Sequence, residues 1–317
     1  MLLVEHVTFS YPPGVPALAD VSFSMREGER VGLVGANGAG KSTLLALLCG
    51  LHLPADGKIV IEGTALAKAT LQGVRAQVGM IFQNPDDQLF MASVFDDVAF
   101  GLRARQEPEE AVYHRVMHTL EHLGIAALAD RPPYRLSGGE KRSAAIASVV
   151  AMQPKYMLYD EPTAFLDRRA KQKLMDIVTA ITAGQLIASH DFELIEAVCD
   201  RVLVLAEGRL IADGDPRALL GDEALLKRAG LYLGGTPFMH EHDGHEHSHG
   251  VQSREETIAA LRYMLRHNEH HAGELRELAH ELTHLGASAQ AEEVLRGLED
   301  YGAGNAKLKN ALEALGG

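Results

Sequence analysis

Residues 35–43, with the sequence GANGAGKST, narrow the fold and the chemistry of this chain more than any other segment. An apolar run at 30–34 precedes them and predicts a buried strand, and a leucine-rich run at 43–48 predicts a helix. A glycine loop between strand and helix lets backbone N–H groups converge on phosphate oxygens at the positive end of the helix dipole. Lys41 is placed to bind the β- and γ-phosphates, and Ser42 to bind Mg²⁺. The segment predicts a nucleotide-phosphate site, the alternative being a glycine-rich turn that binds nothing.

Composition limits the partners and the cellular setting. The 317 residues, 46% hydrophobic and 23% charged, suit a soluble protein with one large and one small domain. A net charge of −13 argues against nucleic acid as the main partner, because phosphate backbones require a basic face. Cys49 and Cys199 lie far apart among apolar residues, which predicts buried thiols in a reducing compartment. Since neither a membrane-spanning run nor a signal-peptide pattern is found, the sequence predicts a cytoplasmic location.

The order of the predicted elements indicates an α/β fold. Apolar runs predict strands at 2–10, 18–25, 57–62, 77–82, 156–161 and 185–190, and a closing hairpin at 202–211. Helical periodicity predicts helices between 94 and 152, at 168–180, and in two short pieces near 215–230. Because strands alternate with helices and polar residues follow the strands, a doubly wound parallel sheet is expected.

Polar side chains follow three of these strands at their carboxyl ends. Asp160 and Glu161 end one strand, which places Asp160 to hold Mg²⁺ through water and Glu161 to accept a proton from an attacking water. His190 ends another strand and is predicted to reach the γ-phosphate. Gln83 follows a third, where a ligand contact and an ordinary polar loop residue are both open.

Two further features outside the phosphate loop admit more than one interpretation. Ser137 and Glu140 form a capping box around Gly138 and Gly139, which weaken the helix they begin. A second helix N-terminus that faces an anion explains those glycines, and an ordinary helix start is the alternative. Tyr11, from its spacing alone, is a strand-end aromatic that packs on the core.

A composition change at 234–237 (GGTP) marks a boundary. We expect a first domain at 1–233, with a helical subdomain at about 84–150, then a linker at 234–253 and a C-terminal helical domain at 254–317. Leucine-rich stripes at 258–265, 275–285, 294–298 and 308–315 predict three or four amphipathic helices in the last part.

Histidines gather in the linker and on the predicted helices, and imidazoles suit Ni²⁺, Co²⁺ and Zn²⁺. The linker carries a candidate transition-metal site that consists of His240, His242, His245, His247 and His249. A disordered tail and a spacer are the alternatives. For the helical histidines a solvated surface is favoured over a metal site; they are His114, His118, His122, His267, His270, His271, His280 and His284.

Taken together, these motifs resemble the nucleotide-binding subunits of ABC transporters over residues 1–230. Residues 35–43 match the Walker A loop, 136–140 the signature motif, and 156–161 Walker B with its catalytic glutamate. The resemblance implies catalytic roles for Lys41, Gln83, Glu161 and His190, and Mg²⁺ contacts for Ser42, Gln83 and Asp160. It implies ATP contacts by the phosphate loop, an adenine-stacking aromatic and a second subunit's signature, namely Tyr11, Gly35, Asn37, Gly38, Gly40, Lys41, Ser42, Thr43, Ser137, Gly138 and Gly139.

The resemblance also implies an architecture and partners. It implies a P-loop, RecA-like parallel sheet with antiparallel β and helical subdomains, followed here by the small all-α domain. Two subunits, identical or paralogous, sandwich ATP and Mg²⁺ and drive a membrane partner through residues 83–90, at the cytoplasmic face of the membrane. Two residues depart from the family pattern: Ser143 stands where arginine is usual, and Phe165 where a small D-loop residue is usual before Asp167. Neither removes a catalytic group.

Within this family, residues 83–90 look like those of energy-coupling-factor importers, most of all the cobalt and nickel uptake ATPases. A vitamin importer of the same subclass is an alternative. A soluble ABC ATPase that acts on DNA or ribosomes is a rival, but residues 44–135 leave no room for a long coiled-coil insertion and the net charge is acidic. A metal-buffering or regulatory role of the tail, 236–317, is compatible with import.

Overall fold

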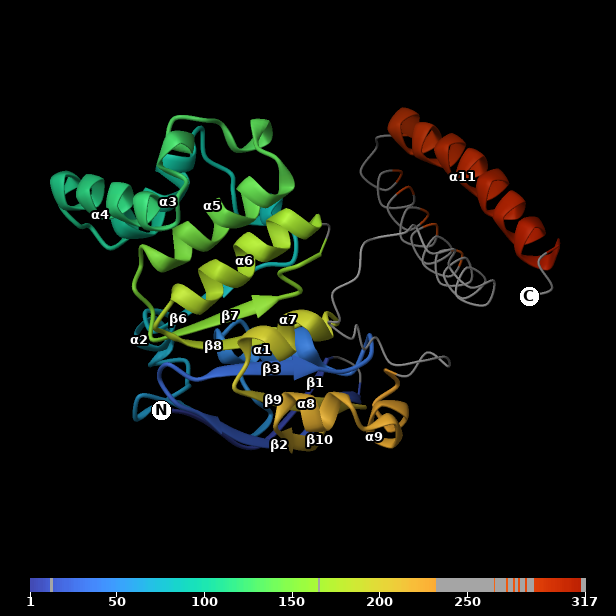
Figure 1. Cartoon of the computed structure of the whole chain (residues 1–317), viewed down its shortest axis with the longest axis horizontal. Helices are drawn as coiled ribbons and strands as arrows, with labels where there is room; N and C mark the ends of the chain where they lie inside the picture. Colours follow the sequence, from blue (N-terminus) through green and yellow to red (C-terminus); the bar gives the residue numbers. More distant parts are fainter. Residues whose placement is uncertain are drawn as a thin grey trace, which may run out of the picture. The chain divides into compact units, whose positions relative to one another are not determined.

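The structure, a computed structural model, describes residues 1–11, 14–164, 166–231 and 288–314, together with positions 265, 272, 276, 279 and 283. The chain divides into two compact units, Met1–Leu233 and Gly234–Gly317. The first unit contains every strand of the described residues, and the second contains the long helix α11 (Figure 1).

A six-stranded sheet forms the centre of the first unit. Its strand order is β10-β9-β3-β8-β7-β6, with neighbours parallel except for the antiparallel edge pair β9–β10. The strands are β3 (Arg30–Val34), β6 (Val78–Ile81), β7 (Tyr156–Asp160), β8 (Gly184–Ala188), β9 (Arg201–Ala206) and β10 (Arg209–Gly214). This order confirms the predicted parallel sheet and its closing hairpin.

A smaller antiparallel sheet has the order β2-β1-β4-β5. It consists of β1 (Leu2–Tyr11), β2 (Val15–Met25), β4 (Asp56–Ile61) and the short β5 (Thr64–Ala65). The antiparallel β subdomain expected of the fold is therefore present.

Helices cover the central sheet on both faces. The described helices of the first unit are α1 (Lys41–Leu48), α2 (Leu71–Arg75), α3 (Val94–Ala104), α4 (Glu109–His122), α5 (Gly138–Val150), α6 (Arg168–Ala180), α7 (Phe192–Val198), α8 (Pro216–Leu220) and α9 (Glu223–Arg228). The helical stretch predicted between 94 and 152 contains α3, α4 and α5, and these helices pack on one another to form the helical subdomain (Figure 1).

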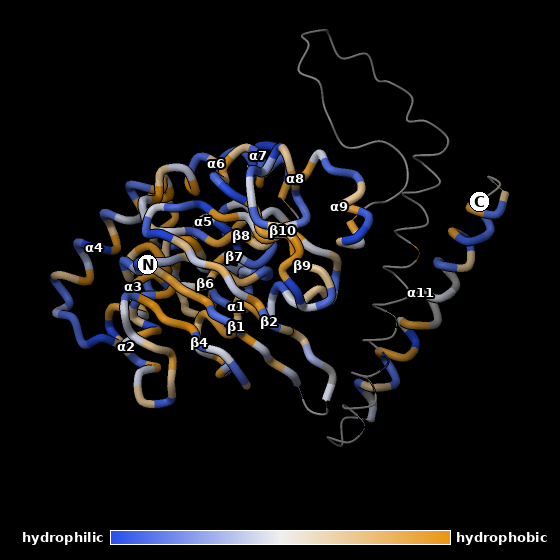
Figure 2. Tube along the Cα trace, turned by 90° about the horizontal axis from the view of Figure 1, so that it is seen from below, coloured by the Kyte–Doolittle hydropathy of each residue, from blue (hydrophilic) through white to orange (hydrophobic). Residues whose placement is uncertain are grey.

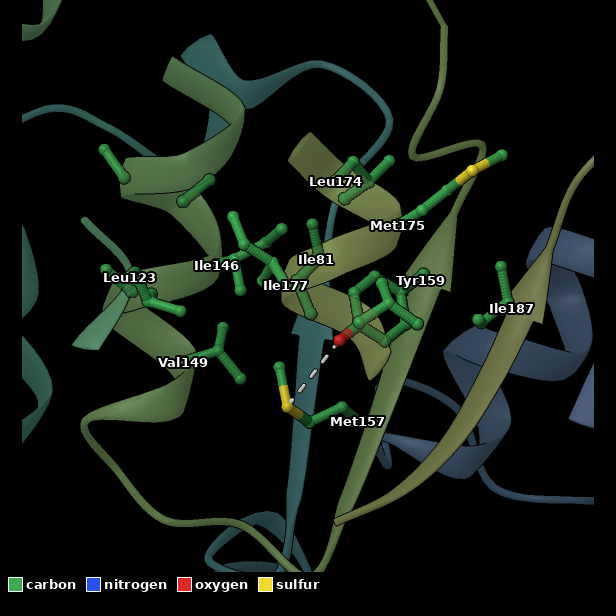
Figure 3. Packing of buried hydrophobic residues seen from close by; sticks show 14 of the residues in the cluster. Ile81, Leu123, Ile146, Val149, Met157, Tyr159, Leu174, Met175, Ile177 and Ile187 are labelled. Carbon is green, nitrogen blue, oxygen red and sulfur yellow. Dashed lines mark hydrogen bonds between the residues drawn. The ribbon is translucent and has the colours of Figure 1, made fainter. Parts of the chain in front are cut away.

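Two hydrophobic clusters lie on the two faces of the central sheet. Tyr159 and Ile187 belong to the cluster that packs under α5 and α6, and Figure 3 shows Tyr159 between Ile177 and Ile187. Their chain neighbours Leu158 and Leu186 belong to the opposite cluster, with α1 and the antiparallel sheet. Since successive side chains of a strand point to opposite faces, a sheet covered on both sides requires continuous apolar strands. Figure 2 shows the hydrophobic residues concentrated along these strands.

In the second unit, α11 (Ser288–Ala314) is one helix of 27 residues. The stripes predicted at 294–298 and 308–315 therefore lie on one helix as far as residue 314, not on two. The helix continues through Gly302 and Gly304, since a glycine costs a helix interior only about 1 kcal/mol. The linker histidines, 240–249, lie outside the described residues. In the described part of the chain, no helix combines the length and apolarity that crossing a membrane requires.

Candidate functional site

The phosphate loop connects β3 to α1 with backbone geometry that requires glycine at two positions. Gly40 has φ 105°, and a Cβ there would lie 2.7 Å from the carbonyl oxygen of Ala17. A Cβ on Gly35 would lie 2.3 Å from the carbonyl oxygen of Leu205. Among the described residues, no side chain caps the start of α1, so its first N–H groups stay available to an anion.

Lys41, the first residue of α1, is 7% exposed. Its Nζ donates to the carbonyl oxygens of Gly35 at 2.7 Å and Ala36 at 3.3 Å, and lies 3.0 Å from Nε2 of His190. Burial lowers the pKa of the ammonium, while the charges of Glu161 and Asp160 oppose that shift. These hydrogen bonds hold the side chain of Lys41 against the phosphate loop.

Two carboxylates end β7 beside this loop. Asp160 shares a hydrogen bond with the side chain of Ser42, and burial raises the pKa of its carboxyl group. Glu161 has φ 43°, and its N–H donates to the carbonyl oxygen of Ala188 at 2.8 Å. Its side chain is 17% exposed, and burial raises its pKa. Ser42 and Asp160 supply hard oxygen donors of the kind that Mg²⁺ prefers, so the residues present fit this ion.

His190 follows β8 and contacts three neighbours through one nitrogen. Nε2 lies 2.9 Å from Oδ1 of Asn37, 3.0 Å from Nζ of Lys41 and 3.3 Å from Oε1 of Glu161. Burial, followed by the charge of Lys41, lowers the pKa of His190 to about 4, so the ring is neutral at pH 7. One neutral ring nitrogen accepts from Lys41 or donates to Asn37, so these contacts are alternatives.

The backbone of His190 also orients Glu161. The N–H of His190 donates to Oε2 of Glu161 at 3.1 Å, and Oγ of Ser189 lies 3.4 Å from the same oxygen. Lys41, Asp160, Glu161 and His190 therefore meet at the carboxyl ends of β3, β7 and β8, the edge where open α/β sheets bind ligands. The cluster can bind a phosphate, hold a carboxylate base beside it and supply a neutral hydrogen-bonding ring.

The loop after β6 contains Gln83, which is exposed. Arg142 donates to the backbone carbonyls of Phe82 at 2.6 Å and Gln83 at 2.5 Å. Gln88 donates from Nε2 to the carbonyl oxygen of Ala145 at 2.8 Å. This loop is therefore bonded to α5, while the Gln83 side chain stays open to solvent.

The predicted capping box begins α5. Oγ of Ser137 accepts from the N–H of Glu140 at 3.4 Å, and Oε2 of Glu140 accepts from the N–H of Ser137 at 2.8 Å. Gly139 has a packing role that sequence reasoning missed, because a Cβ there would lie 2.8 Å from Cβ of Ala170 on α6. Within the described residues, no hydrogen bond joins 137–139 to the phosphate loop of the same chain.

Tyr11 lies at the end of β1 and is 44% exposed. Its ring packs edge-on against Phe9, with centroids 5.0 Å apart, and against His52 at 5.5 Å. The strand-end packing read from the sequence is present. The exposure also leaves ring surface for a base to stack on.

Of the other residues singled out from the sequence, the structure describes some and leaves others outside its described range. Ser143 is buried, and its hydroxyl donates to the carbonyl oxygen of Gly139 at 3.0 Å. Oδ1 of Asp167 accepts from the N–H of Ala170 at 2.8 Å as the N-cap of α6. Phe165 lies outside the described residues, as do the histidines at 267, 270, 271, 280 and 284. The histidines of α4, at 114, 118 and 122, are exposed, and the described residues include no group of three metal-ligating side chains.

Sequence reasoning missed three contributors to this site. Ser189 is buried and contacts Glu161, and its polarity at the end of an apolar strand was an available signal. Asn37 was assigned to ATP but not to His190. Arg142 belongs to none of the motifs found in the sequence, and only its hydrogen bonds to the backbone of Phe82 and Gln83 show its contribution.

Comparison with known proteins agrees with this geometry. The sequence model of the family described as ABC transporter matches residues 18–164, and that of a domain of unknown function matches residues 257–315. The energy-coupling factor transporter ATP-binding protein EcfA of Methanothermobacter thermautotrophicus is 42% identical over 74% of this chain and 78% of its own length. The cobalt import ATP-binding protein CbiO of Rhodobacter capsulatus is 42% identical over 73% of this chain and 84% of its own length. The nickel import ATP-binding protein NikO of the same organism is 42% identical over 73% of this chain and 95% of its own length.

Solved structures give the same result. The cbiO1 protein of Clostridium perfringens, part of a cbiONQ transporter complex, has a TM-score of 0.65 and 34% identity over 73% of this chain and 95% of that chain. The ATP-binding cassette MJ0796, a dimer bound to ADP and Pi, has a TM-score of 0.62 and 25% identity. The match covers 68% of this chain and 99% of that chain. With the site geometry, these likenesses show that the chain belongs to the ABC transporter ATP-binding proteins, a family of ATPases.

Proposed function

We propose that this chain is the ATP-hydrolysing subunit of a membrane importer for cobalt or nickel ions. The observation that carries the ATPase part is the meeting of Lys41, Asp160, Glu161 and His190 at one sheet edge. The cargo is inferred from relatives whose names state cobalt and nickel import. The chain then works at the cytoplasmic face of the membrane as a peripheral subunit.

Each residue of the cluster has a distinct part in hydrolysis. The amides of residues 35–43 and Lys41 bind the phosphates. Ser42, Asp160 and Gln83 would hold Mg²⁺, which would supply positive charge to neutralise the phosphates. Glu161 orients the attacking water and takes its proton, because its carboxylate is fixed by the N–H of His190. The neutral ring of His190 donates a hydrogen bond near the γ-phosphate.

Two copies of the chain, or this chain and a paralogue, complete the site. In the second copy Ser137, Gly138 and Gly139 face the γ-phosphate, and Tyr11 of the first stacks on adenine. Support comes from the exposed capping box at the start of α5 and from the dimeric state of MJ0796. ATP closes the dimer, and residues 83–90 pass the motion to a membrane-embedded partner.

The linker histidines at 240, 242, 245, 247 and 249 are proposed to bind the transported metal. The chemistry of imidazole supports this, since Ni²⁺, Co²⁺ and Zn²⁺ all accept it as a ligand. Titration of the full chain with Ni²⁺ or Co²⁺, beside a variant with these five histidines changed to asparagine, tests the assignment. Equal binding by both chains contradicts it.

Two alternatives keep the ATPase and change its use. One is a vitamin importer, which the general energy-coupling-factor relative favours because its name states no metal. The other is an ATPase without a transport role that carries a metal-binding regulatory tail.

Uptake in the organism that carries the gene decides between these functions. Replacing Glu161 by Gln at the chromosomal locus should abolish uptake of radiolabelled cobalt or nickel and leave vitamin uptake unchanged. Loss of vitamin uptake alone supports the first alternative, and normal uptake of every substrate supports the second.

A further inference from the structure

Arg142 is a buried cation at the junction between α5 and the loop after β6. It is 2% exposed. Its two terminal nitrogens donate to consecutive backbone carbonyls, Nη1 to Phe82 at 2.6 Å and Nη2 to Gln83 at 2.5 Å. One side chain of α5 therefore fixes two peptide units at the end of β6.

Burying the guanidinium of Arg142 in this way costs folding free energy. In the described part of the chain, no carboxylate pairs with Arg142 and its Nε has no hydrogen-bond partner. Desolvation lowers its pKa to about 10. Because burying a charge that only neutral groups solvate destabilises a fold, an apolar residue would suit a purely structural position better.

The same loop has two more bonds to α5. Gln88 donates to the carbonyl of Ala145 at 2.8 Å and to Oγ of Ser148 at 3.0 Å. Nζ of Lys141 lies 2.5 Å from Oδ1 of Asp86. Residues 82–89 are thus attached to α5 at three places along the loop, and a shift of α5 moves the loop with it.

We propose that Arg142 is a positioning residue that ties the Gln83 backbone to α5 and so aims the Gln83 amide at the nucleotide-bound Mg²⁺. The proposal rests on the proposed function, in which Gln83 contacts this ion. The new element is the connection between α5 and Gln83. Because Ser137 caps α5, the helix that presents the signature residues also sets the position of Gln83, through the guanidinium of Arg142. A metal contact at Gln83 then depends on where α5 lies.

The test compares Arg142→Gln with the wild-type full chain. Backbone amides in the 82–89 peptide should exchange faster in the variant without nucleotide, because two anchored carbonyls are released. The Mg²⁺ concentration for half-maximal ATPase should rise about tenfold, a usual effect of losing an outer-shell partner. ATP affinity measured in EDTA should stay unchanged, since the phosphate loop is untouched. Arg142→Lys should give intermediate values, and it carries the test if Arg142→Gln does not fold.

Arg105→Gln is the matched control. Arg105 also spans two backbone carbonyls, of Met152 at 3.0 Å and Ala76 at 3.3 Å, but it does not touch Gln83. An equal rise in the Mg²⁺ requirement in this control overturns the proposal, as does unchanged exchange or an unchanged Mg²⁺ requirement in the Arg142 variants.

Gln83→Ala separates this inference from the function it rests on. If Gln83→Ala raises the Mg²⁺ requirement and the Arg142 variants do not, the tie is wrong and the ATPase assignment stands. If Gln83→Ala has no effect, the proposal falls as well, because the orientation of Gln83 then has no consequence. Absence of ATPase activity in the wild-type chain contradicts the proposed function itself.

Discussion

Glu161 is held in a backbone conformation that non-glycine side chains rarely adopt, with φ 43°. Such strain persists where the surroundings fix it, and here the N–H of Glu161 donates to the carbonyl of Ala188 while its carboxylate accepts from the N–H of His190. The side chain is thus aimed before any ligand binds. This pre-positioning is the reason to assign it the proton of the attacking water.

Replacing Glu161 by Gln should therefore lower ATP turnover by at least about 100-fold, because the amide keeps the shape and loses the base. ATP binding should remain, since Lys41 and the phosphate loop are unchanged. Steady-state hydrolysis and nucleotide binding measure the two effects. Glu207→Gln is the control, because Glu207 also has positive φ but lies exposed at the β9–β10 turn. Near-normal turnover in Glu161→Gln removes this residue from the role.

The pKa of His190 gives a prediction on stability and pH. The folded value is about 4, below the ordinary 6.5, so the unfolded chain binds the proton more readily between these values. Stability contributed at this position is fully present above pH 6.5 and is lost as the pH falls toward 4. As the pH is lowered from 7.5 to 5, the melting temperature of the wild type should therefore fall more than that of His190→Asn. A pH-independent difference contradicts the neutral ring of His190.

The sequence predicted the residues of this site better than their contacts. Lys41, Asp160, Glu161 and His190 follow from motif spacing and from the rule that parallel strands end at one edge. The bond from the N–H of His190 to Glu161 joins residues 29 positions apart and depends on the register between β7 and β8. No local pattern records such a register, and the tie from Arg142 was missed for the same reason.

Among the elements, α5 and α6 approach each other closely at one glycine. The Cβ that alanine would add at position 139 would lie 2.8 Å from Cβ of Ala170. Gly139 therefore has two reasons to be glycine, the packing of α6 and the proposed ATP contact of the signature. A paired substitution separates them.

Gly139→Ala should destabilise the chain by about 1–3 kcal/mol, because the two helices must move apart. Adding Ala170→Gly removes the opposing methyl group and should restore the melting temperature to that of Ala170→Gly alone. ATPase activity should stay low in the double variant if the Cβ also blocks the ATP contact. Thermal unfolding and hydrolysis of the three variants measure both effects, and full recovery of hydrolysis leaves packing as the only role of Gly139.

Elements were predictable where the pattern was long and unambiguous. The strands β3 and β7 and the helix α6 lie at or within one residue of their predicted ranges, because an apolar strand buried on both faces and a capped amphipathic helix have strong signals. The short α2, α7 and β5 were missed, since their five, seven and two residues hold too little periodicity. The stripes at 294–298 and 308–315 were predicted separately, although α11 contains both as far as residue 314.

For the whole molecule, the proposed dimer assigns each ATP to two chains, one supplying Lys41 and the other Ser137. Lys41→Ala alone and Ser137→Asp alone should each be inactive, since every site of either homodimer lacks one part. A mixed dimer has one site with both defects and one site with neither. Mixing the two variants in equal amounts should therefore restore up to about a quarter of the wild-type sites, because half of randomly formed dimers are mixed. The measurement is ATP hydrolysis by the mixture against each variant at the same total concentration. A mixture no more active than its components contradicts the shared site, whereas a contact of Ser137 with ATP in its own chain predicts that outcome.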